Sequence, residues 1–156
     1  GVNSPELTES MALALKTLGV EKAMVVYGHG GIGEISTAGL TQISSLQEGI
    51  VETTTVKPSD FGVVEAPLLK LKGGTPEQGA EIAYKVLTGE ADQSKMDIVL
   101  VNSSAGIKMA GLADDLVHGM ELAKKSIESG AAYEKLKRMV SMSGGDLTRL
   151  EQLENG

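Results

Sequence analysis

The chain has 156 residues, and its 14 Lys and Arg against 21 Asp and Glu give a formal net charge of −7. It contains no Cys, which excludes disulfides, zinc–thiolate sites and thiol catalysis, and its 2 His exclude a three-histidine metal site. The basic residues form no stripe in the sequence, so neither a nucleic acid nor an anionic membrane is an expected partner.

Length and hydropathy are typical of one globular domain with a sizeable core. Hydrophobic residues make up 41% of the chain and charged residues 22%, which does not fit a disordered protein. No apolar run approaches the ~18 residues that span a bilayer, and no segment resembles a signal peptide. We therefore expect a cytoplasmic chain. Two features are unusual, namely the 20 Gly and the first residue, which is Gly1 and not Met.

The N-terminal third predicts a helix that leads into a buried strand. Pro5 and Glu6 are typical of a helix start, and Gly19 is typical of a helix end. Four apolar residues at spacings of four, four and three predict the buried face of this helix, and they are Leu7, Met11, Leu15 and Leu18. Residues 22–27 (KAMVVY) predict a strand covered on both faces, which indicates an α/β layer architecture.

The middle of the chain predicts short β elements and turns. Residues 40–46 and 49–57 form two β-prone runs separated by two residues, which predicts a hairpin at the edge of the sheet. Residues 34–37 also have the pattern of a strand. A turn is expected at 58–62, and one turn of helix at 67–72.

The C-terminal half predicts helices. A capping box, in which Thr75 is followed three residues later by Gln78, opens a helix that Gly89 ends. A second helix begins at Asp114 and Asp115, and a third ends near residue 143, after which a polar tail is expected to fray. Residues 96–110 have the pattern of either a buried strand or a buried helix, and periodicity does not separate the two.

One segment combines glycines, a strand end and polar side chains, and it spans residues 28–34 (GHGGIGE). Ligands bind at the carboxyl ends of strands in open α/β sheets, and glycines let the backbone approach a ligand closely. Backbone N–H groups in such a loop can cradle phosphate, and the Glu34 carboxylate could hold Mg²⁺. The alternative is a flexible connection between strands, with an exposed His29 and a solvated Glu34.

The order of the segments resembles one family. The stretch GVNSPELTESMALALKTLGVEKAMVVYGHGGIGEIS is similar to a stretch of the anthranilate phosphoribosyltransferases, where the pattern runs G-V-Y-S-P-E-L, a helix, L-G-x-x-x-A-x-V-V-H-G, then D-G-L-D-E-[IL]-S. SDFGV, GGTPEQGAEI, VLTGE, DIVLVNSSAGIKMAG and ELAKKSIESGAAYEKL follow in the family's order. The similarity extends from Gly1 to about Val140.

This resemblance implies an enzyme of tryptophan biosynthesis, which transfers the phosphoribosyl group of phosphoribosyl pyrophosphate to the amine of anthranilate with Mg²⁺. The family's fold joins a small helical domain to a larger α/β domain. We therefore expect an incomplete α/β domain, with a mixed sheet of parallel strands and an antiparallel edge, packed by helices and mostly helical toward its C-terminus. The resemblance also implies that residues 96–110 are helical.

The family's site residues carry over only in part. Its two magnesium-binding acids fall on Gly33 and Glu34, so one carboxylate is missing. The family's Asp before this pair falls on Gly30, and its His falls on Tyr27. The resemblance therefore implies a weakened Mg²⁺ site at Glu34. Candidates for contact with substrate or pyrophosphate are Gly28, His29, Gly30 and Gly31.

Other family motifs precede the matching region. These are the pyrophosphate-cradling G-T-G-G-D loop, the K-H-G-N-R segment and a substrate-binding Arg. We therefore expect residues 1–143 to be the C-terminal portion of the phosphoribosyltransferase domain, residues 144–156 to be a polar tail, and the isolated chain to be inactive. The expected partner is the N-terminal half of the same enzyme, without which an exposed sheet edge favours self-association. Two alternatives stay open, a relative of the nucleoside phosphorylases and a non-catalytic binding or structural domain.

Overall fold

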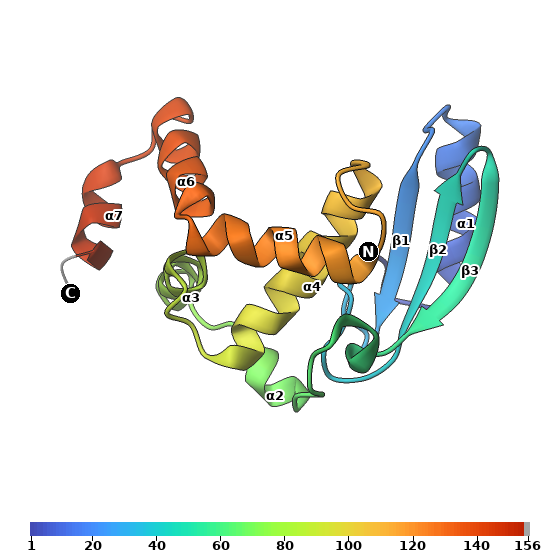
Figure 1. Ribbon diagram of the computed structural model, residues 1–156, viewed down its shortest axis with the longest axis horizontal. Helices are drawn as coiled ribbons and strands as arrows, with labels where there is room; N and C mark the ends of the chain where they lie inside the picture. The colour runs from blue at the N-terminus through green and yellow to red at the C-terminus, as the bar shows by residue number, and fades with distance from the viewer. Residues whose placement is uncertain (155–156) are drawn as a thin grey trace.

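The computed structural model describes residues 1–154 and places a small sheet beside a set of helices (Figure 1). The elements in chain order are α1 (Glu6–Thr17), β1 (Ala23–Gly28), β2 (Thr41–Gln47), β3 (Ile50–Val56), the 3₁₀ helix η1 (Pro58–Phe61), α2 (Leu68–Leu71), α3 (Pro76–Thr88), α4 (Gln93–Met109), α5 (Leu116–Glu128), α6 (Ala131–Met142) and α7 (Leu147–Glu154). The expected α/β class and the mainly helical C-terminal half are confirmed.

The sheet has the order β1-β2-β3, and both of its pairings are antiparallel. The predicted hairpin is confirmed by the antiparallel pairing of β2 with β3, and its turn is formed by Glu48 and Gly49, one residue later than predicted, both with positive φ angles. The expectation of parallel strands is wrong for residues 1–154. On the edge of β1 that faces away from β2, the backbone hydrogen bonds within residues 1–154 run from Val2 N–H to the Val26 carbonyl over 3.0 Å and from Gly28 N–H to the Ile32 carbonyl over 2.9 Å.

Helix α1 packs on the sheet through a different face from the predicted one. Thr8 and Ala12 are 0% exposed, whereas Leu18 is 79% exposed. The small residues allow close approach, and the Thr8 hydroxyl accepts a hydrogen bond from Gln42 Nε2 over 2.7 Å. This polar contact with the sheet rotates the helix, so the predicted Leu and Met face is largely turned outward.

The opposite face of the sheet carries the hydrophobic core. Val26 and Ile43 are paired across β1 and β2, and they cluster with Val101 and Ala105 of α4 and with Phe61 of η1. β1 is therefore buried on both faces, as predicted. Residues 93–109 are helical, as the family resemblance implies, and α4 begins at Asp92, whose side chain accepts from the backbone of its first turn.

The predicted start and end of α3 and the predicted start of α5 are confirmed. Thr75 and Gln78 form the expected capping box of α3, and Gly89 ends that helix with a left-handed φ of +82°. Asp115 caps α5 by accepting from His118 N–H over 2.8 Å. These signals lie within a few residues of one another, so neighbouring sequence alone determines them.

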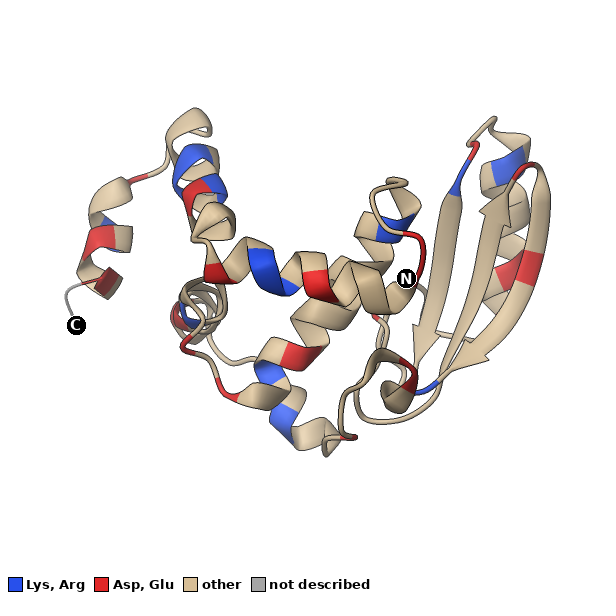
Figure 2. Cartoon of the chain, viewed as in Figure 1, with Lys and Arg blue, Asp and Glu red and all other residues tan. Residues whose placement is uncertain are grey.

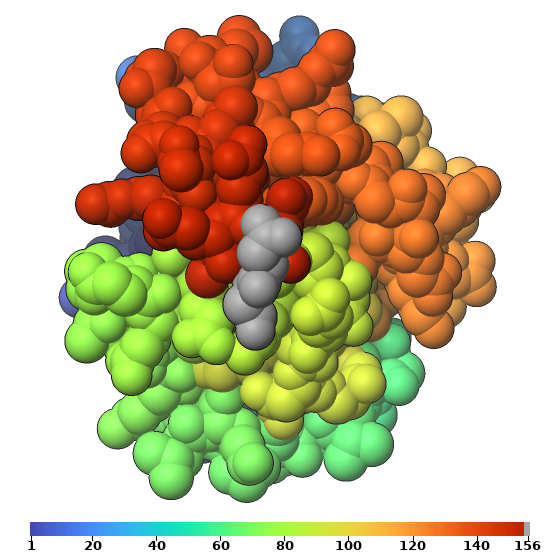
Figure 3. Space-filling view, turned by 90° about the vertical axis from the view of Figure 1, so that its left-hand side faces the viewer, coloured from blue at the N-terminus to red at the C-terminus, as the bar shows by residue number. Residues whose placement is uncertain are grey.

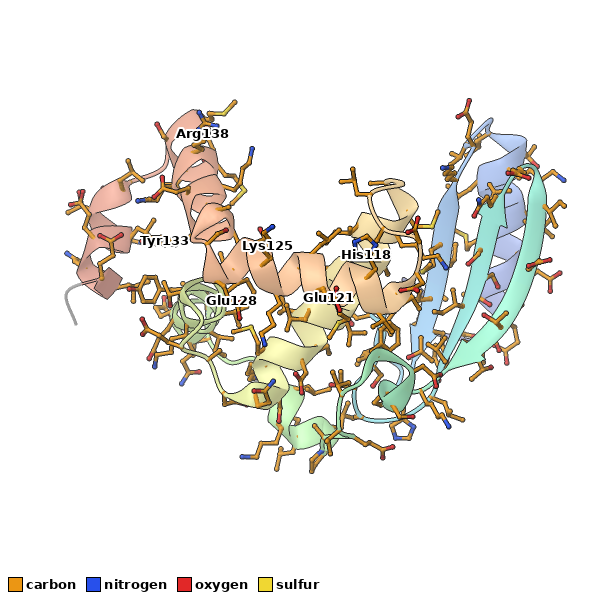
Figure 4. All side chains as sticks on the ribbon, viewed as in Figure 1. His118, Glu121, Lys125, Glu128, Tyr133 and Arg138 are labelled. Atoms are coloured by element: carbon orange, nitrogen blue, oxygen red, sulfur yellow. The ribbon has the colours of Figure 1, made fainter. Side chains whose placement is uncertain are left out.

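The C-terminal segment forms a helix, although the sequence predicts a frayed tail. Leu150 of α7 is buried, and Tyr133 of α6 donates a hydrogen bond to Glu154 over 2.5 Å. The Tyr133 ring meets Tyr84 of α3 edge to face, with centroids 5.7 Å apart. Tyr133 is labelled in Figure 4, and Figure 3 shows the orange-red and red C-terminal helices beside the yellow-green α3. Burial, followed by the bond to Glu154, raises the pKa of Tyr133 above its ordinary value. Residues 155 and 156 lie outside the described residues, and the boundary after residue 143 stays a prediction.

Charged side chains of both signs are interspersed over the molecule (Figure 2). On α5, Glu121, Lys125 and Glu128 alternate in sign along the helix (Figure 4). Within residues 1–154, no helix combines the length and the apolar composition needed to cross a bilayer.

Candidate functional site

The glycine-rich loop begins where β1 ends and folds back as a tight turn. Gly31 N–H donates to the Gly28 carbonyl over 3.0 Å, and Gly28 N–H donates to the Ile32 carbonyl over 2.9 Å. Gly30 and Gly31 have φ angles of +84° and +78°, which disfavour a residue with a side chain. The loop thus forms a hydrogen-bonded turn, and it leaves His29 and Glu34 exposed.

Gly30 and Gly33 occupy different surroundings. A Cβ atom on Gly30 would lie 2.6 Å from Cδ2 of Leu68, the first residue of α2. A Cβ atom on Gly33 would meet only Gly1 and Val2, at 3.5 Å or more, and its φ is not in the left-handed region. A side chain at Gly30 would be strained by the left-handed φ and would displace the end of the Leu68 side chain, whereas a side chain at Gly33 has room.

His29 is held by the segment that leads into β2. Its backbone N–H donates to the Leu40 carbonyl over 2.9 Å. Its ring lies against Gly39, where a Cβ atom would be only 2.7 Å from the His29 Cγ. The His29 side chain is exposed and accepts or donates no hydrogen bond within residues 1–154.

The predicted strand at residues 34–37 is wrong, because a side chain from α4 and not a neighbouring strand holds this segment. Asn102 Oδ1 accepts from Ile35 N–H over 2.8 Å, and Asn102 Nδ2 donates to the Ile35 carbonyl over 2.9 Å. The same Nδ2 donates to the Ile98 carbonyl over 2.8 Å. Asn102 thus fixes the backbone that follows Glu34. In the sequence, Asn102 is an amide side chain within the apolar stretch of α4, and its role was not predicted from the sequence.

Hydroxyl groups fix the rest of the segment. The Thr41 hydroxyl accepts from Ser36 N–H over 2.8 Å, and the Ser36 hydroxyl accepts from Ala38 N–H over 3.1 Å. Thr37 differs from both, because its hydroxyl is buried and has no hydrogen-bond partner within residues 1–154. A buried hydroxyl without a partner lowers the stability of the folded state.

We expect the substitution Thr37→Val to raise the free energy of unfolding by about 1 kcal/mol, because valine keeps the shape and removes the unsatisfied hydroxyl. Thr41→Val is the matched control, and we expect it to lower the free energy of unfolding by about 1–3 kcal/mol by leaving Ser36 N–H buried and unpaired. Urea denaturation measures both. A loss of stability in Thr37→Val equal to that in Thr41→Val would contradict the prediction.

Glu34 is the only carboxylate of residues 28–34, and it is exposed. It lines an open hollow of about 500 Å³ between the loop and α4, together with Ile32, Leu71, Ile98, Val99, Asn102 and Ser103. Within residues 1–154, no three His, Asp or Glu side chains lie close enough together to hold a metal ion. Mg²⁺ requires near-octahedral oxygen ligands, so this set of ligands does not fit a protein-built magnesium site.

The sequence model of one family, described as "Glycosyl transferase family, a/b domain", matches residues 1–133. Helix α7 therefore lies beyond the matched residues. The match includes the glycine-rich loop, Glu34 and Asn102.

Curated relatives of this chain are anthranilate phosphoribosyltransferases. The protein from Desulfatibacillum aliphaticivorans is 42% identical over 143 residues, which are 92% of this chain and 42% of that protein. The protein from Pelotomaculum thermopropionicum is 41% identical over 144 residues, which are 92% of this chain and 41% of that protein. The chain thus spans less than half the length of these relatives.

Solved structures of anthranilate phosphoribosyltransferases share the fold of this chain. The crystal structure of the anthranilate phosphoribosyltransferase from Thermus thermophilus has a TM-score of 0.81 at 36% identity, covering 90% of this chain and 41% of that one. The enzyme from Saccharomyces cerevisiae in complex with PRPP and Mg has a TM-score of 0.79 at 27% identity, with the same coverage. The resemblance inferred from sequence is confirmed, and the chain belongs to the glycosyl transferase family that this α/β domain defines.

Proposed function

We propose that this chain supplies part of a phosphoribosyl-transfer site, at which phosphoribosyl pyrophosphate reacts with the amine of anthranilate. The observation that carries the proposal is the match in fold and sequence to anthranilate phosphoribosyltransferases over nine-tenths of the chain. In this proposal the loop of Gly28, His29, Gly30 and Gly31 contacts the substrate or its pyrophosphate, because the loop ends β1 and its glycines allow close approach; the N–H groups of Gly28, His29 and Gly31 already donate within the chain.

The isolated chain is proposed to be inactive. Phosphoribosyl transfer depends on positioning and on stabilising the charge of the leaving pyrophosphate. Residues 28–34 contain one carboxylate and one His but no Lys or Arg to neutralise that charge. The remaining groups are proposed to come from the part of the longer relatives that this chain does not span.

Exposed apolar surface on this chain supports the proposal that the remaining portion of the enzyme packs against it. Leu7 and Met11 of α1, and Leu18 directly after it, are exposed, although their spacing is that of a buried stripe. The outer edge of β1 pairs with no strand within residues 1–154 and carries backbone hydrogen bonds only to Val2 and Ile32. A hollow of about 260 Å³ between β1 and α4 is lined by Val26, Ile35 and Ala105, among others. We propose that the complementary portion of the enzyme covers these surfaces, and that without it the chain self-associates through its open sheet edges.

Loss of anthranilate from the assay mixture, in the presence of phosphoribosyl pyrophosphate and Mg²⁺, measures the proposed reaction. We expect no turnover by the chain alone. We expect turnover after addition of the portion of the Thermus thermophilus enzyme that this chain does not span. Turnover by the chain alone would contradict its proposed incompleteness. A mixture that binds but gives no product would contradict the assignment of the reaction.

A non-catalytic binding or structural role is the second candidate, because glycines stand at positions 30 and 33 where the family pattern has acids. Calorimetry with phosphoribosyl pyrophosphate separates the two. A catalytic partner should release heat in the reconstituted mixture, and a structural domain should not. The relatives and structures described above are anthranilate phosphoribosyltransferases, which favours this reaction over that of a nucleoside phosphorylase.

A further inference from the structure

A pocket of about 360 Å³ lies among the helices, and it shares no residue with the loop of residues 28–34. Its lining comes from η1 and the turn after it, from the connection between α3 and α4, and from α4 and α5. The volume is typical of small-molecule pockets, which are mostly apolar with a few placed polar groups. The apolar side chains of the lining are Phe61, Val63, Met96, Leu100, Met120 and Ile127. The two methionines are flexible, so this surface adapts to the shape of an apolar ligand.

Asp97 of α4 is a nearly buried acid in this lining, with 9% of its surface exposed. Within residues 1–154, its side chain has one hydrogen bond, which Oδ1 accepts from Gln93 Nε2 over 2.6 Å, and no ion pair. Burying a carboxylate costs free energy unless a cation or several hydrogen-bond donors replace the lost water. A cationic donor in the pocket therefore gains more at Asp97 than it would at an exposed acid, because charges attract more strongly away from water.

The other two charges of the lining already pair with each other. Lys124 Nζ lies 3.7 Å from Glu128 Oε1, and the two side chains are 66% and 62% exposed. Glu128 is the last residue of α5 (Figure 4). Because these opposite charges offset each other, Asp97 is the unpaired charge of the lining within the described part of the chain. The pocket as a whole is thus negative and attracts a cation.

The lining suits an organic cation better than a metal ion. Divalent metal ions need several oxygen ligands, and no three His, Asp or Glu side chains gather closely enough to hold one within residues 1–154. We propose that this pocket binds a small primary amine in its ammonium form, with the ammonium group donating to Asp97. An apolar body of about the size of a phenyl ring contacts Met96 and Met120 and gains from burial.

Titration of the ¹⁵N-labelled full chain with phenethylamine, followed by NMR, tests the proposal. The amide signals of residues 61–63, 89–97 and 120–128 should shift and saturate. 2-Phenylethanol has the same body with a hydroxyl in place of the ammonium group. It should bind at least about tenfold more weakly, since hydrogen bonds to charged partners are roughly twice as strong as neutral ones. Equal binding of the two compounds, or an absence of saturable shifts, would overturn the proposal.

Asp97→Asn removes the charge and keeps an oxygen that can accept from Gln93, so the fold should persist. This variant should bind phenethylamine at least about tenfold more weakly and 2-phenylethanol unchanged. Asp114→Asn is the matched control, because it makes the same change at an exposed acid outside the pocket, and it should bind phenethylamine as the wild type does.

Glu128→Gln distinguishes the nearly buried acid from the exposed one. A loss of phenethylamine binding in Glu128→Gln that is absent in Asp97→Asn would contradict the proposal, because the attraction would then come from the exposed acid. The pocket and the loop share no residue, so the binding of the amine and the transfer of the phosphoribosyl group can each fail without the other.

Discussion

The substitution Asn102→Ala should lower the free energy of unfolding by about 3 kcal/mol, because it removes three hydrogen bonds worth about 1 kcal/mol each. It also leaves the N–H of the buried Ile35 without a partner, which adds to the loss. Guanidinium denaturation measures the change. Amide hydrogen exchange at residues 33–36 should quicken more than exchange in β2 or β3, since the lost bonds hold that segment alone.

Ser103→Ala is the control, because Ser103 follows Asn102 in α4 and its side chain makes no hydrogen bond within residues 1–154. We expect a change within about 0.5 kcal/mol. Asn102→Asp should fall between the two, because it keeps an acceptor for Ile35 N–H and loses both donations. If Asn102→Ala and Ser103→Ala are equally stable, the amide does not hold the loop.

The substitution Leu46→Ala should lower the free energy of unfolding by about 2–5 kcal/mol, the range for removing a large side chain from a packed core. Leu46 is 0% exposed and lies on the side of β2 that faces α1. Gln42 and Ser44 lie on the same side of the strand. The hydrogen bonds from these two residues to Thr8 hold α1 against the sheet, so the space that alanine leaves cannot close easily. Thermal or urea unfolding followed by circular dichroism measures the loss.

Leu40→Ala offers a matched comparison, because it removes the same atoms from a residue beside β2 that is 61% exposed. Its effect should stay within about 0.5 kcal/mol. A loss for Leu40→Ala as large as that for Leu46→Ala would show that burial does not set the energetics of this face.

Local sequence predicts much of this fold. The capping box at Thr75 and the cap at Asp115 each depend on residues within one turn of one another, so their signals are complete in short windows. The hairpin was predicted as well, although its turn lies at residues 48–49 and not at 47–48. The helix at 93–109 required the family resemblance, because the apolar run at Ile98 fits a strand and a helix equally well.

Features that depend on distant side chains were not predictable in this way. The orientation of α1 follows from Thr8 bonding to Gln42, and periodicity instead favours the more hydrophobic Leu stripe. Residues 34–37 have a strand pattern, yet Asn102, 67 residues from Ile35 in sequence, supplies their hydrogen bonds. Helix α7 is short and polar, and its formation depends on Leu150 and Glu154 meeting other helices.

The candidate site likewise has some features that the sequence predicts and others that depend on contacts between distant residues. Glycine density and the strand end locate the loop of residues 28–34, and the family pattern locates Glu34 and the missing acid at Gly33. Neither source indicates that Leu68 lies over Gly30, or that Asn102 and Thr41 hold the segment behind the loop. These contacts join parts of the chain that only folding brings together.

The contact between Gly30 and Leu68 has a genetic consequence. Every glycine codon differs by one second-position base from a codon for Asp or Glu, so the acid at position 33 lies one mutation away and folding does not oppose it. At position 30 the same mutation places a side chain on a backbone with a left-handed φ of +84° and against the end of the Leu68 side chain, which must shift. An acid at position 30 therefore carries a cost in folding stability that an acid at position 33 does not, so the same base change is tolerated more easily at position 33.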